Sequence, residues 1–165
     1  VFSGQYDENS HKTGEWHFKD TVVYKNWSTE YYLNNKLNGK SQHFYLNGLV
    51  KDSGQYKEDD EEGEWKYYYS NGNLFKICNY KEGNLIGAYR EYYSNQIIKL
   101  KGQYIQDTGY NNSIGISVGG RSSSKHKSKT RVIRQFITNK AYKHGVWEYF
   151  DSKGKLVKRV SYNSR

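Results

Sequence analysis

The sequence predicts an all-β fold in which β-hairpins are stacked into an elongated antiparallel meander. The first observation behind this prediction is an internal repeat. Segments of similar layout begin at five lead glycines, and the first steps between them are 25, 24 and 24 residues. A fixed period in this range is typical of repeat architectures. The lead glycines are Gly14, Gly39, Gly63, Gly87 and Gly145.

A second anchor and the composition favour the same fold. The anchor occurs in phase with the lead glycines, at 24-residue steps, as Gly54-Gln55-Tyr56, Cys78-Asn79-Tyr80 and Gly102-Gln103-Tyr104. The 165 residues include 18 tyrosines and no proline, a composition that suits pleated, half-buried strands. The single cysteine excludes an internal disulfide framework. Because Cys78 stands where other units have glycine, we expect a packed thiol.

Each repeat unit is predicted to be two strands joined by a tight turn. In one unit, residues 63–69 form the first strand, residues 70–73 the turn and residues 74–80 the return strand. The turn contains Asn71-Gly72, and Asn-Gly between strand-like runs predicts a type I′ turn with positive φ at both central residues. Residues 80–87 are then the connector to the next hairpin.

The alternation of aromatic residues predicts which side chains share a face of the sheet. Position +2, counted from the lead glycine, is occupied by Trp16, Ser41, Trp65, Tyr89 and Trp147. Position +5 is occupied by Phe44, Tyr68, Tyr92 and Phe150. The two positions differ by an odd number, so they face opposite sides of a strand. We therefore expect aromatic rows on both faces, and a structural role for most of these rings instead of a stacking surface for nucleic acid.

The segment from Gly63 to Leu74 carries the pattern Gly-x-Trp-x-x-Tyr-x-x-Asn-Gly-x-Leu, which resembles the MORN repeat in the variant common in bacteria, the YwqK-like antitoxin family. The resemblance extends over most of the chain, from about Gly4 to Tyr162. It implies stacked hairpins in a single curved sheet. It also implies a protein-binding or membrane-associated scaffold, and an antitoxin role for some bacterial members. Ser41 and Gln96 depart from the pattern, so we expect those two units to be distorted.

The repeat is interrupted after Tyr104. We interpret the interruption as one unit with a lengthened hairpin at 113–137, in which residues 113–118 and 131–137 alternate like strands. The tip between them is rich in Gly, Ser and Lys, and such a composition is typical of mobile loops. We therefore expect a single repeat domain over 1–165 with about six or seven units.

The positive charge is concentrated in this lengthened hairpin. Between Asp107 and Glu148 there are no acidic residues and eight basic ones, out of a net charge of +9 for the chain. A local field of one sign can steer an acidic protein, a nucleic acid or an anionic membrane, although a solvated loop is the alternative. The candidate partner-binding residues are Arg121, Lys125, Lys127, Lys129, Arg131 and Arg134.

Other motifs do not predict catalysis or metal binding. Residues 115–122 match the spacing of a phosphate loop, but no helix is predicted after them. The acidic run 57–62 lacks the glycine and spacing of a calcium loop, and the five histidines show no metal-ligand spacing. Glu15 and Glu64 are expected to be repeat-equivalent surface carboxylates. We therefore predict a protein that is not an enzyme, with no catalytic residue, cofactor or metal.

Three functional hypotheses remain open at this stage. The first is a non-enzymatic binding scaffold for another protein, such as a bacterial antitoxin or immunity protein that binds a toxin. The second is binding to a polyanion, nucleic acid or anionic membrane, through the basic hairpin. The third is an accessory repeat region of a larger enzyme. The chain begins at Val1 without an initiator methionine, so we expect that an N-terminal piece was removed, and both a bacterial cytoplasm and export stay open.

Overall fold

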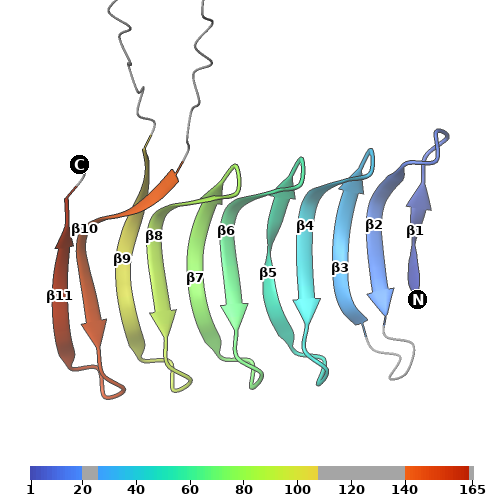
Figure 1. The fold of residues 1–165 in the computed structure, drawn as a ribbon. Helices are drawn as coiled ribbons and strands as arrows, with labels where there is room; N and C mark the ends of the chain where they lie inside the picture. Colours follow the sequence, from blue (N-terminus) through green and yellow to red (C-terminus); the bar gives the residue numbers. More distant parts are fainter. Residues whose placement is uncertain (20–25, 108–139, 164–165) are drawn as a thin grey trace, which may run out of the picture.

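A computed structural model describes residues 1–19, 26–107 and 140–163. In this part of the chain, eleven β-strands form one antiparallel sheet, and each strand pairs with the next along the sequence (Figure 1). The predicted all-β meander is confirmed. No helix among these residues is long and apolar enough to cross a membrane. The strands are β1 (Phe2–Tyr6), β2 (Lys12–Lys19), β3 (Asn26–Leu33), β4 (Lys36–Phe44), β5 (Val50–Lys57), β6 (Asp60–Tyr68), β7 (Leu74–Lys81), β8 (Asn84–Tyr92), β9 (Ile98–Asp107), β10 (Lys140–Phe150) and β11 (Leu156–Tyr162).

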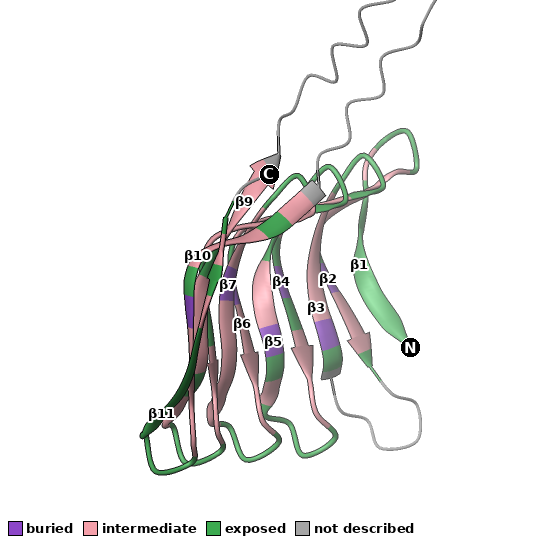
Figure 2. Cartoon of the chain, turned by 60° about the vertical axis from the view of Figure 1, so that its left-hand side comes forward, coloured by how far each residue is buried: buried purple, intermediate pink, exposed green. Residues whose placement is uncertain are grey.

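The lead glycines lie at β-bulges, and these bulges bend the strands. At Gly63 the φ angle is 72°, and the β5–β6 register shifts there, because Ser53 pairs with Lys66 while Gln55 pairs with Glu62. A bulge of this kind bends its strand and increases the local twist, and glycine adopts the positive φ without steric cost. The bent strands in Figure 2 give the single curved sheet that the resemblance implied.

The turns at one edge of the sheet differ from the prediction. Gly72 N donates to Tyr69 O at 2.9 Å, Tyr69 N donates to Asn73 O at 2.8 Å, and Gly72 has a φ of 86° whereas Asn71 does not adopt a positive φ. These are the features of a three-residue loop, a type I turn followed by one left-handed residue. The predicted type I′ turn is therefore wrong, because only the third loop residue has the positive φ.

The turn at Gln96 keeps this geometry without a glycine. Gln96 has a φ of 68°, its N–H donates to Tyr93 O at 2.9 Å, and Tyr93 N donates to Ile97 O at 2.8 Å. The expected distortion of this unit is thus absent. A left-handed non-glycine residue is uncommon, so the hydrogen bonds of the turn and its neighbours hold it in place.

Two-residue turns with two positive φ angles occur at the opposite edge, in the predicted connectors. Between β5 and β6, Glu58 has a φ of 53° and Asp59 has a φ of 76°, and the flanking Lys57 and Asp60 are paired. The same arrangement joins β3 to β4 and β7 to β8. The type I′ turns therefore occur in these connectors, which contain no Asn-Gly pair, and not in the Asn-Gly turns at the other edge.

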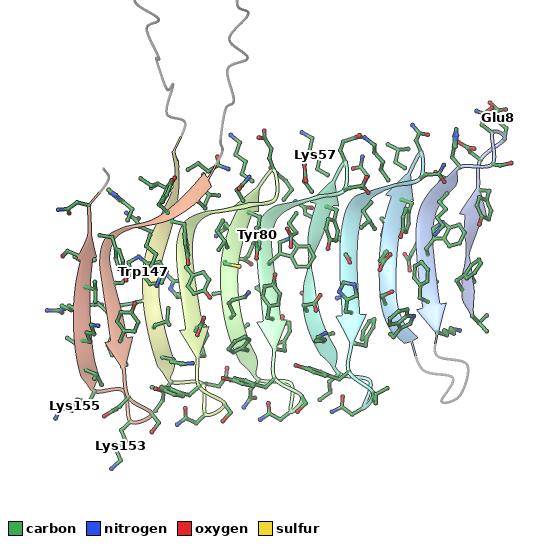
Figure 3. The ribbon with its side chains drawn as sticks, viewed as in Figure 1. Glu8, Lys57, Tyr80, Trp147, Lys153 and Lys155 are labelled. Atoms are coloured by element: carbon green, nitrogen blue, oxygen red, sulfur yellow. The ribbon has the colours of Figure 1, made fainter. Side chains whose placement is uncertain are left out.

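Tryptophans at position +2 form the centre of the core on one face of the sheet. Trp65 is only 2% exposed, and it covers Gly54 of the neighbouring strand so closely that a Cβ there would lie 2.2 Å from the ring. Tyr56 and Tyr80 contact the ring edge-on, with centroid distances of 5.1 and 6.4 Å. Trp16 over Gly4 and Trp147 over Gly102 repeat this arrangement. Trp147 is labelled in Figure 3.

Cys78 is the packed thiol that the sequence predicts. It is fully buried and occupies the position of Gly54 one unit later. Cys78 lies opposite the β8 bulge that precedes Tyr89. In this unit tyrosine replaces the larger tryptophan at position +2, and cysteine replaces the smaller glycine on the preceding strand. Desolvation raises the pKa of the thiol, which disfavours the reactive thiolate.

Tyrosine hydroxyls connect successive units at the turn edge. In each case the tyrosine at position +6 donates to the backbone carbonyl at position +5 of the next unit. Each bond runs from the turn of one hairpin to the first strand of the next hairpin, so it reinforces the backbone pairing between successive units. The bonds are Tyr45 to Tyr68 O at 2.6 Å, Tyr69 to Tyr92 O at 2.7 Å and Tyr93 to Phe150 O at 3.0 Å.

Candidate binding surface

The predicted basic site lies outside the described residues. This applies to Arg121, Lys125, Lys127, Lys129, Arg131 and Arg134 and to the lengthened hairpin at 113–137. The two flanking strands are described, and Asp107 of β9 is paired with Lys140 of β10. β9 and β10 are therefore neighbours in the sheet. One further basic residue, Lys143, extends its ammonium over the Trp147 ring, 4.3 Å from the centroid, a cation–π contact that belongs to the core.

The acidic run 57–62 has intramolecular partners. Asp59 Oδ1 accepts a hydrogen bond from Leu37 N at 2.7 Å, and Glu58 pairs with Lys36 Nζ at 2.7 Å. Glu62 Oε2 accepts from Glu82 N at 3.0 Å. These carboxylates join neighbouring type I′ turns to one another. In the described part of the chain, no group of three or more His, Cys, Asp or Glu residues is arranged to hold a metal ion.

One unit replaces the tryptophan arrangement with an ionic cluster. His43 Nδ1 lies 2.5 Å from Asp52 Oδ1, and His43 Nε2 lies 3.5 Å from Glu30 Oε1. The hydroxyl of Tyr32 donates to Glu30 Oε2 at 2.7 Å. Asp52 is buried, with 8% of its surface exposed, and His43 is half-buried. Ser41 stands at the +2 position of this unit, and its buried Oγ has no hydrogen-bond partner in the described structure.

The electrostatics of the cluster favour a charged imidazolium between two carboxylates. The hydrogen bond to Asp52, followed by the one to Glu30, raises the pKa of His43 to about 9. The same contact with His43 lowers the pKa of Glu30, although burial opposes this shift. Charge-assisted hydrogen bonds of this type are stronger than neutral ones. Since both ring nitrogens already have carboxylate partners, the imidazole offers no free nitrogen for proton transfer to a substrate, and the cluster is structural.

Sequence reasoning missed this cluster, although a signal existed. Glu30 occurs 24 residues before Gly54, so it occupies the second anchor of its own unit. The spacing of the histidines did not indicate metal binding, and neither Glu30 nor Asp52 was singled out. Ser41 is much smaller than the tryptophan that occupies this position in most other units. The backbone of this unit is not distorted, because β3, β4 and β5 keep their pairing, and only the side chains differ.

The opposite face of the sheet contains a polar groove of about 590 Å³ across β2 to β6. We call it the polar groove. Gly54 and buried Ser41 are among the residues that line it, and the other lining residues carry polar side chains. The lining residues are Glu15, Thr29, Tyr31, Lys40, Ser41, Gln42, Ser53, Gly54, Gln55 and Glu64.

Position +1 supplies a row of alternating charges to the polar groove. The row consists of Glu15 on β2, Lys40 on β4 and Glu64 on β6, and all three are exposed. Strands lie about 4.8 Å apart, so residues two strands apart are separated by about 9.6 Å. The sequence prediction treated Glu15 and Glu64 as repeat-equivalent surface carboxylates. They are repeat-equivalent, but the structure also brings them into one groove with Lys40.

The carboxylates and the ammonium of this row differ in their partners. Glu15 accepts a hydrogen bond from the Tyr31 hydroxyl and lies 3.0 Å from His17 Nε2. Glu64 is 3.0 Å from Lys66 Nζ. Lys40, in contrast, makes no hydrogen bond or ion pair with any side chain of the described residues. The centre of the groove therefore holds an uncommitted cation between two partly satisfied carboxylates.

Comparison with known proteins supports the repeat assignment in part. The family model described as a MORN repeat variant matches residues 61–82 and 143–164, which cover the β6–β7 and β10–β11 hairpins. No curated protein matches the chain. MORN repeats are generally associated with binding and scaffold roles. The antitoxin assignment rests on the resemblance alone.

Proposed function

We propose that this chain is a non-enzymatic scaffold that binds another protein. The observation that carries the proposal is the polar groove, in which uncommitted Lys40 lies among exposed polar side chains on a continuous sheet. The sheet is held by backbone ladders and by bonds between turns, so the groove is presented on a rigid support. A rigid surface loses little conformational entropy when it binds a partner.

The arrangement of the titratable groups supports binding over catalysis. The perturbed pKa of His43 arises in a cluster whose donors and acceptors are already paired. The His43 side chain of that cluster lies on the face opposite Lys40, since the two residues are three positions apart on β4. A perturbed pKa often marks an active site, but structural ion pairs produce the same shift.

Among protein partners, a toxin that the chain neutralises is the one that the resemblance suggests. The polar groove carries two carboxylates and one ammonium, which suit a partner surface of mixed charge. We therefore propose a bacterial antitoxin or immunity function as the finer form of the scaffold role.

The test is affinity capture with the full chain immobilised through its C-terminus. A specific protein partner should be retained from a lysate of the source cell, and the purified pair should form a complex of defined stoichiometry in isothermal titration calorimetry. If no retained protein binds the purified chain, the scaffold proposal fails. Inhibition of a partner's toxicity on co-expression would support the antitoxin form.

A second candidate function is polyanion binding through the basic segment, and the charge distribution favours it. The eight basic residues between Asp107 and Glu148 have no acidic neighbours in sequence. Binding to single-stranded DNA or to vesicles with anionic lipid would then weaken steeply with salt. A variant with alanine at Arg121, Lys125, Lys127 and Lys129 should lose it, and unchanged binding by this variant would remove the candidate.

A further inference from the structure

We propose that the polar groove binds an extended segment of a partner protein in the polyproline II conformation, with a basic, an acidic and a basic residue at positions i, i+3 and i+6. This inference rests on the proposed protein-binding function and specifies the segment that is recognised. It starts from the row of Glu15, Lys40 and Glu64, which are supplied by alternate strands of one face.

The spacing of the row fits this conformation. Neighbouring strands are about 4.8 Å apart, so the row spans about 19 Å from β2 to β6 in two steps of about 9.6 Å. A polyproline II helix rises about 3.1 Å per residue with three residues per turn, so every third side chain returns to the same face after about 9.3 Å. Two steps span about 18.6 Å, which is close to the width of about 19 Å that the row covers across the strands.

Other peptide conformations fit the row less well. In a β-strand, residues i and i+3 are about 10 Å apart but point to opposite faces. In an α-helix, residues i, i+7 and i+14 share a face but span about 21 Å at 1.5 Å per residue. The helix therefore accumulates a mismatch of about 2 Å over the row, and it hides the backbone groups that the groove could bind.

The side chains between the charges suit an extended backbone. A polyproline II segment makes no internal hydrogen bonds, so its carbonyl groups need external donors. Gln42 and Gln55 line the groove, are exposed, and make no side-chain hydrogen bond in the described structure. Each amide can both donate and accept. Tyr31 adds a half-buried aromatic ring, a surface on which proline-rich segments commonly dock.

The charges on the groove determine the order of charges on the ligand. Lys40 has no partner in the described chain, so an acidic residue at the centre gains a new ion pair. Glu15 and Glu64 each have one or two donors but retain free lone pairs, because a carboxylate can accept about four hydrogen bonds. Basic residues at the ends of the peptide therefore complete the row. The reverse order places like charges opposite one another.

The experiment is fluorescence anisotropy with the full chain and labelled peptides that contain the core KPPDPPK. We expect this peptide to bind at least tenfold more tightly than DPPKPPD, which has the inverted charge order, and than PKPDPKP, in which the charges are two residues apart. Binding should weaken with salt, because the groove is exposed. Equal affinity for all three peptides, or no binding by any of them, would overturn the inference.

Matched variants separate specific recognition from general attraction. Lys40→Glu should reverse the preference at the central position, so that KPPKPPK binds more tightly than KPPDPPK. Glu64→Gln should weaken binding of KPPDPPK several-fold. Arg90→Gln changes an exposed charge on the same face of β8, outside the groove, and should leave binding unchanged. These exposed substitutions are expected to keep the fold, which circular dichroism and urea midpoints would check.

Failure of the polar groove as the binding site can be distinguished from failure of the scaffold proposal. A protein partner that is captured by the wild-type chain and equally by the variant Glu15→Gln/Lys40→Gln/Glu64→Gln would preserve the scaffold function and overturn the groove as its site. A captured partner that is lost only with the triple variant, and that competes with KPPDPPK, would support both.

Discussion

The β5–β6 unit and the β3–β4 unit share one backbone geometry but fill it differently. In the first, Trp65 covers Gly54 and is enclosed by tyrosine rings. In the second, the equivalent positions hold Ser41 and Glu30, and Glu30 joins an ionic cluster through His43. Both units keep antiparallel pairing with a bulge at the lead glycine.

The comparison shows that the cross-strand pair is the unit of variation in this repeat. A tryptophan at position +2 covers a glycine on the preceding strand, Tyr89 is combined with Cys78 of the preceding strand, and Ser41 is combined with Glu30 of the preceding strand. Because interiors are close-packed, the volume added on one strand must be removed from the other. The backbone geometry is therefore the same in each unit, whereas the two side chains of the pair change together from unit to unit.

The largest expected effect is the loss of the tryptophan itself. Trp65→Ala should lower the free energy of unfolding by about 3–5 kcal/mol, because a large buried side chain is removed and its neighbours cannot close the cavity. Urea denaturation followed by circular dichroism would measure the change. A loss below about 1 kcal/mol would mean that the aromatic row is not the main source of stability.

The second effect tests the glycine side of the same pair. Gly54→Ala would put a Cβ 2.2 Å from a ring carbon of Trp65, and overpacking of this kind costs about 1–3 kcal/mol or more. The matched control is Gln55→Ala, an exposed residue on the same strand, which should change stability by less than about 0.5 kcal/mol. The double variant Gly54→Ala/Trp65→Phe should recover part of the loss, and no recovery would show that the clash lies elsewhere.

Much of the fold could be predicted from the sequence because it depends on local pattern. The 24-residue period and the aromatic alternation identify the strands and the buried tryptophans. The turn types could not be predicted, since Asn71-Gly72 is compatible with both two-residue and three-residue loops. Asp59, which has a positive φ, accepts a hydrogen bond from Leu37 N of another hairpin, and a contact of this kind has no local signal in the sequence.

The candidate site was less predictable for a related reason. Glu15 and Glu64 could be identified as repeat-equivalent, and Lys40 follows from the same count. Their significance depends on which side chains already have partners, and this is a property of the packed face. The ionic cluster was detectable in principle, because Glu30 replaces a glycine in the 24-residue register.

The ionic cluster should make stability depend on pH in a window where the tryptophan units do not. The pKa of His43 is about 9 in the folded chain and roughly 6.5 in an unfolded one. The raised pKa gives stability that is fully present below pH 6.5 and is lost as the pH rises to 9. A shift of this size corresponds to about 3 kcal/mol, which we reduce to about 1–2 kcal/mol because His43 is only half-buried.

Urea midpoints at pH 6, 7.5 and 9 would measure this effect, with His43→Gln as the comparison. The wild-type chain should lose stability across the window, and the variant should lose clearly less. NMR titration of the His43 ring would report its pKa directly, and Asp52→Asn should move that pKa towards 6.5. A His43 pKa near 6.5 in the wild-type chain would contradict the ionic interpretation.

The smallest effect has the opposite sign and completes the comparison at position +2. Ser41 is 1% exposed and its Oγ has no partner in the described structure, so the hydroxyl is desolvated without compensation. Ser41→Ala removes an unsatisfied polar group and should be neutral or stabilising by up to about 1 kcal/mol. Urea denaturation at pH 6, where His43 is charged, gives the most direct measurement. A loss above about 1 kcal/mol would mean that the hydroxyl is bonded within the cluster, and that position +2 contributes to stability in both units.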